Sequence, residues 1–203
     1  MTGGREDNPK VEKILAGARQ VFLQHGYGAA TTDMVQQAAG VSKSTVYSYF
    51  PGKDALFAAV VQTECERLVG DVHRERVKAH TVRETLLRMG EKLFETILAP
   101  SVLALLRIVI AESPRFPHLG AAVREAGALP LQRELADYLV EASWHGELRA
   151  ADTRAAARHF IGMVLHDVQM DCLLGQRPPP AAADTRTIVE AAVDAFLRAY
   201  APL

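Results

Sequence analysis

The chain has 203 residues, a length that suits one domain or two small ones. Hydrophobic residues make up 49% and charged residues 23%, which is ordinary for a globular protein and argues against intrinsic disorder. The net charge of -1 excludes a uniformly basic nucleic-acid coat but leaves room for a local basic face. The two cysteines, Cys65 and Cys172, make no disulfide framework and no CxxC zinc pair, which is typical of a reducing cytoplasm.

The first ten residues, MTGGREDNPK, contain acids and no apolar run, so we do not expect a signal peptide. The longest nearly apolar stretch, residues 102–111, is interrupted by Arg107 and is far shorter than the ~20 residues that span a bilayer. We therefore expect a cytoplasmic protein without membrane contact. Residues 9–53 carry five basic and two acidic side chains, and this charge of +3 hints at nucleic-acid contact on an otherwise acidic chain.

Helical signals begin at Asn8, a capping residue, followed by Pro9 at the first helical position. A stripe of apolar side chains at helical spacing runs from Val11 to Phe22, and a glycine at position 26 can end the helix. Two short helices follow: one at 31–39, with Thr31 or Thr32 as its cap, and one at 43–50, with Ser42 as its cap. Gly40 separates them, and a Pro-Gly pair stops the second. Residues 31–50 therefore predict a helix, a tight turn and a second helix.

The rest of the chain predicts further helices and no strands. We expect them at 53–78, 81–98, 100–112, 118–144 with an interruption near Pro130, 152–174 and 184–200, with Thr81, Asp152 and Asp184 as caps. The predicted class is all-α with about nine helices. We place an N-terminal three-helix domain at 1–55 and a larger helical domain at 56–203.

The outer face of the helix at 43–50 is rich in hydroxyl groups and carries one lysine. Packing of the two short helices would use Val35, Ala39, Val41, Val46 and Phe50. The residues left outside are Lys43, Ser44, Thr45, Tyr47, Ser48 and Tyr49. Such a surface suits hydrogen bonds to phosphates and to base edges in a major groove. The alternative interpretation is an ordinary helical hairpin in a bundle.

From about Val11 to Leu56 the sequence resembles the TetR family of bacterial transcriptional repressors. The resemblance rests on Gly26-Tyr27, the cap at Thr31, AAGVSKSTVYSYF at 38–50, and Lys53. Val35-Gln36 departs from the Ile-Ala pair that is usual in the family. Residues 106–119, LRIVIAESPRFPHL, resemble the C-terminal domain of the AefR-like subgroup.

This resemblance implies a helix-turn-helix domain that binds double-stranded operator DNA. The positions that match DNA-approaching positions of the family are Thr31, Lys43, Ser44, Thr45, Tyr47, Tyr49 and Lys53, with Ser48 as a weaker candidate. We expect Lys43 and Lys53 to contact phosphate, and Ser44 and Thr45 to face base edges. Tyr47 would reach the DNA backbone or a thymine methyl group. Packing against the first helix is the alternative for Tyr49.

The last helix is apolar around most of its circumference, which indicates burial on two sides. One side can face its own domain, and the other predicts a homodimer, as the resemblance also implies. Candidate interface residues are Val164, Val168, Ile188, Val189, Ala192, Val193, Phe196 and Tyr200. The alternative is a single large bundle with this helix at its centre.

The larger domain also holds candidates for a ligand pocket. We expect residues 102–111 to form a buried helix in which Arg107 pairs with Glu91 or Glu112, or meets an anionic ligand. His159, Met163, His166 and Met170 share one helix face beside Asp167, which can be plain core, a pocket wall or an incomplete metal site. The candidate pocket residues are Met89, Leu93, Phe94, Arg107, Phe116, Trp144, Met163, His166 and Met170.

These observations predict a dimeric regulator, a repressor released from its operator by a small, largely apolar effector. No cofactor and no metal are expected. A helical-bundle enzyme is one alternative, but the GxSxG, HExxH, Walker and GxGxxG motifs are absent from the sequence, and Asp167 with Asp171 is the one carboxylate pair worth testing. The other alternative is a regulator that binds a protein partner instead of DNA. A redox role for either cysteine has no resolving cysteine to support it.

Overall fold

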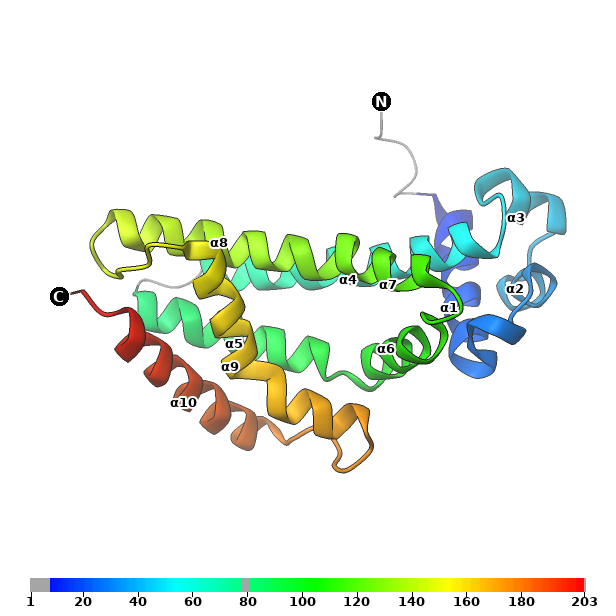
Figure 1. Ribbon diagram of the computed structural model, residues 1–203. Coiled ribbons are helices and arrows are strands. Elements are labelled where there is room, and N and C mark those ends of the chain that lie inside the picture. The colour runs from blue at the N-terminus through cyan, green and yellow to red at the C-terminus, as the bar shows by residue number, and fades with distance from the viewer. Residues whose placement is uncertain (1–7, 78–80, 203) are drawn as a thin grey trace. The chain divides into compact units, whose positions relative to one another are not determined.

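The computed structural model describes residues 8–77 and 81–202, and every regular element among them is a helix (Figure 1). The expected all-α class is confirmed. The chain divides into two compact units: the first comprises Met1–Cys65, described from Asn8 onward, and Ala104–Ala126, and the second comprises Glu66–Leu103 and Gly127–Leu203. The predicted division at residue 55 differs, because Leu56, Phe57 and Val60 belong to the core of the first unit.

The first unit begins with three helices whose starts match the capping residues of the sequence. They are α1 (Pro9–Ala29), α2 (Thr32–Ala39) and α3 (Lys43–Tyr49). The side chains of Asn8, Thr31 and Ser42 accept hydrogen bonds from backbone amides of the first turns. Gly40, with φ of 63°, makes the left-handed turn between α2 and α3 that only glycine adopts without strain.

The start of α4 (Lys53–Val77), most of α6 (Pro100–Glu112) and α7 (Pro117–Val123) complete the first unit. Its core centres on Phe22, Tyr27 and Phe57, whose rings lie 5.1–6.0 Å apart. The expectation of a fully buried helix at 102–111 is wrong. Val109 is buried, whereas Arg107 and Ile110 are exposed, so α6 is covered on one side alone.

The second unit contains α5 (Val82–Ile97), α8 (Leu129–Trp144), α9 (Thr153–Leu173) and α10 (Ala182–Tyr200). α10 packs against both α5 and α9, and α8 packs against α9. Where α5 meets α9 and α10, a Cβ at Gly90 would lie 2.7 Å from Cγ1 of Val189, so only glycine permits this close approach. Edge-on packing of Phe160 and Phe196 fills the core between α9 and α10.

One expected detail of these helices is wrong. Asp184 does not cap α10, because the helix begins at Ala182 and Asp184 lies in its first turn, where its charge suits the helix dipole. The interruption expected near Pro130 is present as a short π-helix (Arg124–Ala128) between α7 and α8, and the proline occupies the first turn of α8. Thr81 and Asp152 cap α5 and α9 as expected.

No single helix of the described chain has the length and apolar character to cross a membrane. Taken as a pair, α5 and α6 have the length and the apolar composition of a membrane span, but the two helices are bent by 64° at their junction.

Candidate functional site

Ser42 organises the start of α3 through three hydrogen bonds of its hydroxyl group. The oxygen accepts from the backbone amide of Thr45 at 3.1 Å, and it lies 2.9 Å from Oγ of Ser44 and 2.7 Å from Oγ1 of Thr45. Because Ser44 and Thr45 are tied to a capping residue, their positions at the helix N-terminus are defined before any ligand binds. The capping role of Ser42 is predictable from the sequence, whereas its contacts with the side chains of Ser44 and Thr45 are not.

Lys43 and Tyr47 are exposed on the same short helix. The ammonium of Lys43 lies 2.7 Å from Oδ1 of Asp33 on α2, and this hydrogen bond and the charge of Asp33 raise the pKa of Lys43. The hydroxyl of Tyr47 is 3.1 Å from Oγ1 of Thr32, a partner that sequence analysis did not single out. Both partners lie on α2, so the two short helices present one polar surface.

Thr31 and Ser48 use their hydroxyls within the backbone of these helices. Thr31 is exposed and accepts from the amide of Met34, and Ser48 donates to the carbonyl of Thr45 at 2.7 Å. Ser48 is nevertheless exposed to solvent, as are Lys43 and Tyr47 of the same helix.

Two expected DNA-approaching residues are held inside the first unit. The hydroxyl of Tyr49 accepts from Nδ2 of Asn8 at 2.9 Å, so the alternative of packing against α1 describes its contact. The ammonium of Lys53 donates to the carbonyls of Tyr27 and Gly28 at 2.8 and 3.1 Å and lies over the Tyr27 ring. In the free protein these two carbonyls hold the ammonium of Lys53, and the phosphate contact expected of Lys53 stays a prediction.

A polar cluster beside Lys53 joins four helices of the first unit and was missed entirely. The hydroxyl of Tyr27 donates to Asp54 and lies 3.3 Å from Nε2 of His118, while the amide of Gly28 donates to Glu112 at 3.0 Å. Burial and the hydrogen bond and charge of Asp54 raise the pKa of Tyr27. This cluster holds the end of α1 to the start of α4, directly after α3.

The expected ligand pocket is not formed, because its residues lie in different environments. Met89 and Leu93 are buried in the core of the second unit, whereas Trp144 is 88% exposed at the end of α8. Met163, His166 and Met170 are exposed on α9. Arg107 and Phe116 belong to the first unit, where Phe116 packs on Tyr27 with ring centroids 5.0 Å apart. Helical spacing correctly predicted which residues share a helix face. It did not predict which of these faces are covered by neighbouring helices.

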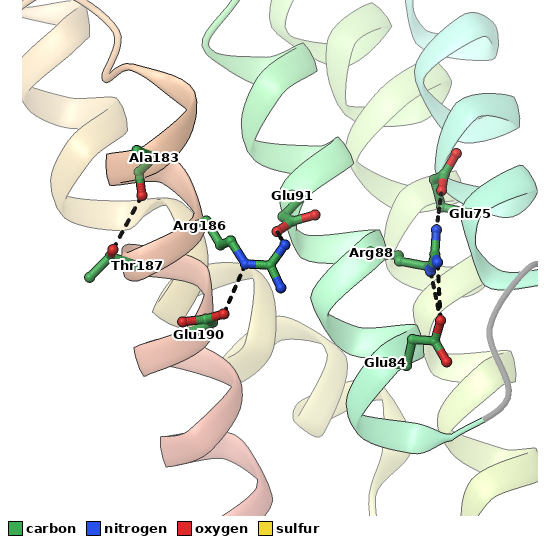
Figure 2. A network of polar contacts seen from close by, with 8 residues as sticks. All are labelled: Glu75, Glu84, Arg88, Glu91, Ala183, Arg186, Thr187 and Glu190. Carbon is green, nitrogen blue, oxygen red and sulfur yellow. Dashed lines mark hydrogen bonds and ion pairs between the residues drawn. The ribbon is translucent and has the colours of Figure 1, made fainter.

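A cavity of about 800 Å³ lies elsewhere in the second unit, and Phe94 is the one expected pocket residue that lines it. α5 and the first turns of α10 form its walls, together with Glu75 of α4 and Pro179 and Pro180 before α10. Figure 2 shows charged side chains meeting across this region, with Arg186 of α10 pointing toward Glu91 of α5.

The expected dimer interface is also corrected. Val164, Val168, Val189, Ala192, Val193 and Phe196 are buried in the core of the second unit, and Ile188 and Tyr200 are partly buried against it. The six buried side chains cannot contact a second copy, because α5 and α9 pack against α10 and cover them, whereas Ile188 and Tyr200 each keep an exposed part. The exposed apolar side chains of this region are instead Met163 (44%), Met170 (48%) and Leu174 (65%), which follow the outer face of α9.

No cluster of three His, Cys, Asp or Glu side chains suited to a metal ion occurs in the described ranges. On α9, Nδ1 of His159 is 2.7 Å from the hydroxyl of Tyr200, and His166 and Asp167 are exposed. Cys172 is buried and Cys65 is partly buried.

Comparison with known sequences identifies both parts of the chain. The model for bacterial regulatory proteins of the tetR family matches residues 14–60, and the model for the C-terminal domain of AefR-like transcriptional repressors matches residues 84–202. The HTH-type transcriptional repressor Rv1474c of Mycobacterium tuberculosis is 40% identical over 63 residues. That alignment spans 31% of this chain and 34% of the relative, so it covers about a third of each.

Solved structures match almost the whole chain. A TetR-family transcriptional regulator of Mesorhizobium loti has a TM-score of 0.87 at 25% identity, covering 96% of this chain and 100% of the other. The flavonoid-responsive regulator FrrA has a TM-score of 0.81 at 33% identity, covering 95% and 97%. These folds and relatives are those of transcriptional regulators and not of enzymes. The chain therefore belongs to the TetR family of bacterial DNA-binding transcriptional regulators, with an AefR-like C-terminal domain.

Proposed function

We propose that this protein is a dimeric transcriptional repressor that leaves its operator when a small, largely apolar molecule binds. The observation that carries the DNA part is the start of α3, where Ser42 holds the hydroxyls of Ser44 and Thr45 beside the exposed Lys43. Short hydroxyl side chains at a helix N-terminus suit base edges, and a neighbouring cation suits phosphate. Operator DNA lies in the bacterial cytoplasm, where we place the protein.

Each exposed residue of this surface has a distinct role in the proposal. Ser44 and Thr45 face base edges, Tyr47 reaches the DNA backbone or a thymine methyl group, and Lys43 contacts phosphate after leaving Asp33. Thr31 and Ser48 flank these groups and contact the DNA backbone. Lys53 fixes the end of α1 against the start of α4 in the free protein and contacts phosphate when DNA is bound.

The proposed dimer uses the outer face of α9. Met163, Met170 and Leu174 lie at helical spacing on this face, and Gly162 just before Met163 and His166 between the two methionines are also exposed. Methionine and leucine side chains on an exposed helix lose unfavourable contact with water when a second copy covers them. A two-fold dimer carries two copies of α3, so its operator should be a palindrome with half-sites one helical turn, ~34–36 Å, or a multiple apart.

The effector part is supported by FrrA, which is described as flavonoid-responsive and is 33% identical over most of both chains. A small molecule can release DNA only if it binds the DNA-incompetent arrangement more tightly.

Selection of bound duplexes from a random DNA pool tests the DNA function directly. A palindromic consensus should emerge, and binding to it should weaken with rising salt because lysines displace counterions from phosphates. Lys43→Ala should weaken operator and random DNA alike and reduce the salt slope by about 1, whereas Lys92→Ala in the second unit should leave both unchanged. Recovery of no sequence from the pool would favour a regulator that binds a protein partner.

A further inference from the structure

The first turn of α2 contacts the two large exposed side chains of α3. Oγ1 of Thr32 lies 3.1 Å from the hydroxyl of Tyr47, and Oδ1 of Asp33 lies 2.7 Å from the ammonium of Lys43. Lys43 and Tyr47 are one helical turn apart and share a face of α3, and their two partners are consecutive in the sequence. The start of α2 therefore holds two groups that the proposed function directs at DNA.

Asp33 and Lys43 are the only charged residues of the sequence between positions 31 and 50, the segment that forms the two short helices. Each of these side chains is 55% exposed, so both are open to solvent. Two opposite charges held 2.7 Å apart cancel at longer range, and salt screens what remains beyond about 10 Å. The segment proposed to meet the major groove is therefore electrically neutral in the free protein.

A carboxylate oxygen and a phosphate oxygen offer the ammonium of Lys43 the same kind of acceptor. Asp33 thus holds, in the free protein, the ammonium that a DNA phosphate takes in the complex. Binding exchanges one ion pair for another, and it leaves the carboxylate of Asp33 near a phosphate of like charge. Both effects reduce the favourable free energy of the phosphate contact.

The geometry points to Asp33 as an internal substitute for phosphate that limits the affinity of the protein for DNA. Asp33 is a positioning residue, because it acts through Lys43. With the phosphate contact weakened, hydrogen bonds from Ser44 and Thr45 to base edges make up a larger share of the binding free energy. This inference rests on the proposed DNA surface, and it adds a residue that opposes binding to those that favour it.

Asp33→Asn tests the inference, since it removes the charge and keeps the shape of the side chain. Fluorescence anisotropy should show binding about threefold or more tighter for the selected operator and for random duplex alike, because Lys43 no longer leaves a charged partner. The salt slope should steepen by about 1, because no carboxylate remains to take up a cation when DNA docks. Asp33→Glu restores the charge and should return the affinity to within about twofold of the wild type.

Two matched controls separate this exchange of ion pairs from other effects. Thr32→Val breaks the neighbouring contact between α2 and α3 without a change of charge, so it should not tighten DNA binding. Asp184→Asn makes the same chemical change at an exposed position in the first turn of α10, in the second unit, and should leave the affinity unchanged. Damage to α2 cannot imitate the expected result, because it would weaken binding.

A double-mutant cycle with Lys43→Ala identifies the route by which Asp33 acts. Without the lysine, Asp33→Asn should tighten binding by less than about twofold, because only the repulsion between carboxylate and phosphate is left to remove. An equal gain with and without Lys43 would show that Asp33 acts by its charge alone, and no gain in the presence of Lys43 would show that Asp33 does not limit binding. Each result would overturn the inference.

The same titrations separate this inference from the proposed function. If the wild type binds neither a selected operator nor random duplex in low salt, the DNA function fails. If the wild type binds DNA and Asp33→Asn binds no more tightly, the DNA function stands and the role of Asp33 is wrong.

Discussion

Ser42 performs two tasks at the start of α3, since one hydroxyl both caps the helix and positions its neighbours. The cap satisfies the amide of Thr45, which would otherwise lack an intrahelical partner. The same oxygen restrains the side chains of Ser44 and Thr45, which lowers the entropy that they lose on contacting a base edge. A single residue therefore couples the stability of α3 to its capacity for recognition.

Ser42→Ala should lower the free energy of unfolding by about 1 kcal/mol, the usual effect of losing an N-cap. Operator affinity should fall as well, because Ser44 and Thr45 lose their common partner. Urea unfolding followed by circular dichroism and a gel shift would measure the two effects. Ser48→Ala is the control, since that hydroxyl contacts only a carbonyl of its own helix and its loss should scarcely change stability.

Helix α2 packs against α1 at Gly17, a position where no side chain fits. A Cβ at Gly17 would lie 2.8 Å from the backbone nitrogen of Ala39, closer than real Cβ atoms approach, and backbone cannot move aside as a flexible side chain can. This crossing sets how the two short helices lie on α1. The second unit uses the same device at Gly90, between α5 and α10.

Gly17→Ala should therefore destabilise the protein by about 1–3 kcal/mol through overpacking, despite the higher helix propensity of alanine. Gly70→Ala in α4 is a matched control. Its Cβ would meet only the tip of Arg74, at 3.5 Å, so the change should stabilise by about 0.5–1 kcal/mol. Thermal unfolding of the two variants should show shifts of opposite sign, and equal shifts would contradict the close approach.

α4 and α8 are joined by Arg76, whose side chain is only 16% exposed. It lies 3.0 Å from Glu134 and 2.5 Å from Glu141, over the ring of Tyr138. Burial acts to raise the pKa of Glu134, but hydrogen bonds from His73 and Arg76 outweigh it and hold the pKa below its ordinary value. The carboxylate form is thus favoured by folding.

Because the pKa of Glu134 is lower in the folded protein, its carboxylate contributes fully to the free energy of unfolding at pH values above the pKa of the unfolded carboxyl. The contribution is lost as the pH falls through the lower pKa of the folded protein. Arg76→Met should cost about 1–3 kcal/mol at neutral pH, because the largely buried Glu134 loses its arginine partner and keeps only His73. Glu134→Gln should flatten the loss of stability on acidification, measured by urea unfolding across the acidic range. An unchanged pH profile would show that Glu134 does not contribute.

Dimerisation of the whole molecule depends on which apolar side chains stay exposed to solvent after each unit has folded. Met163→Glu and Met170→Glu alter exposed positions of α9, so the monomer should fold normally while dimerisation weakens at least about tenfold. Val193→Glu places a carboxylate in the core and should unfold the protein instead. Analytical ultracentrifugation with circular dichroism distinguishes the cases. Wild-type dimerisation of both methionine variants would exclude this face of α9.

Much of the fold was predictable because its signals are local. The caps at Asn8, Thr31, Ser42, Thr81 and Asp152 and the glycine turn at position 40 depend on a few neighbouring residues, and the structure has each where expected. The exposed hydroxyl face of α3 follows from helical spacing for the same reason. The amphipathic pattern of each helix is a property of the chain that needs no tertiary contact.

Contacts between distant segments could not be read in this way. The apolar circumference of α10 predicted two covered sides correctly, but only the packing of α5 and α9 against it shows that both coverings are internal. The carbonyls that bind Lys53 and the carboxylate that holds Gly28 come from other helices, and no periodicity marks them. The same holds for the cavity, whose walls join residues as distant in the chain as Glu91 and Arg186. A hydrophobic pattern indicates that a helix face is buried, and only the packed chain shows which neighbouring element covers that face.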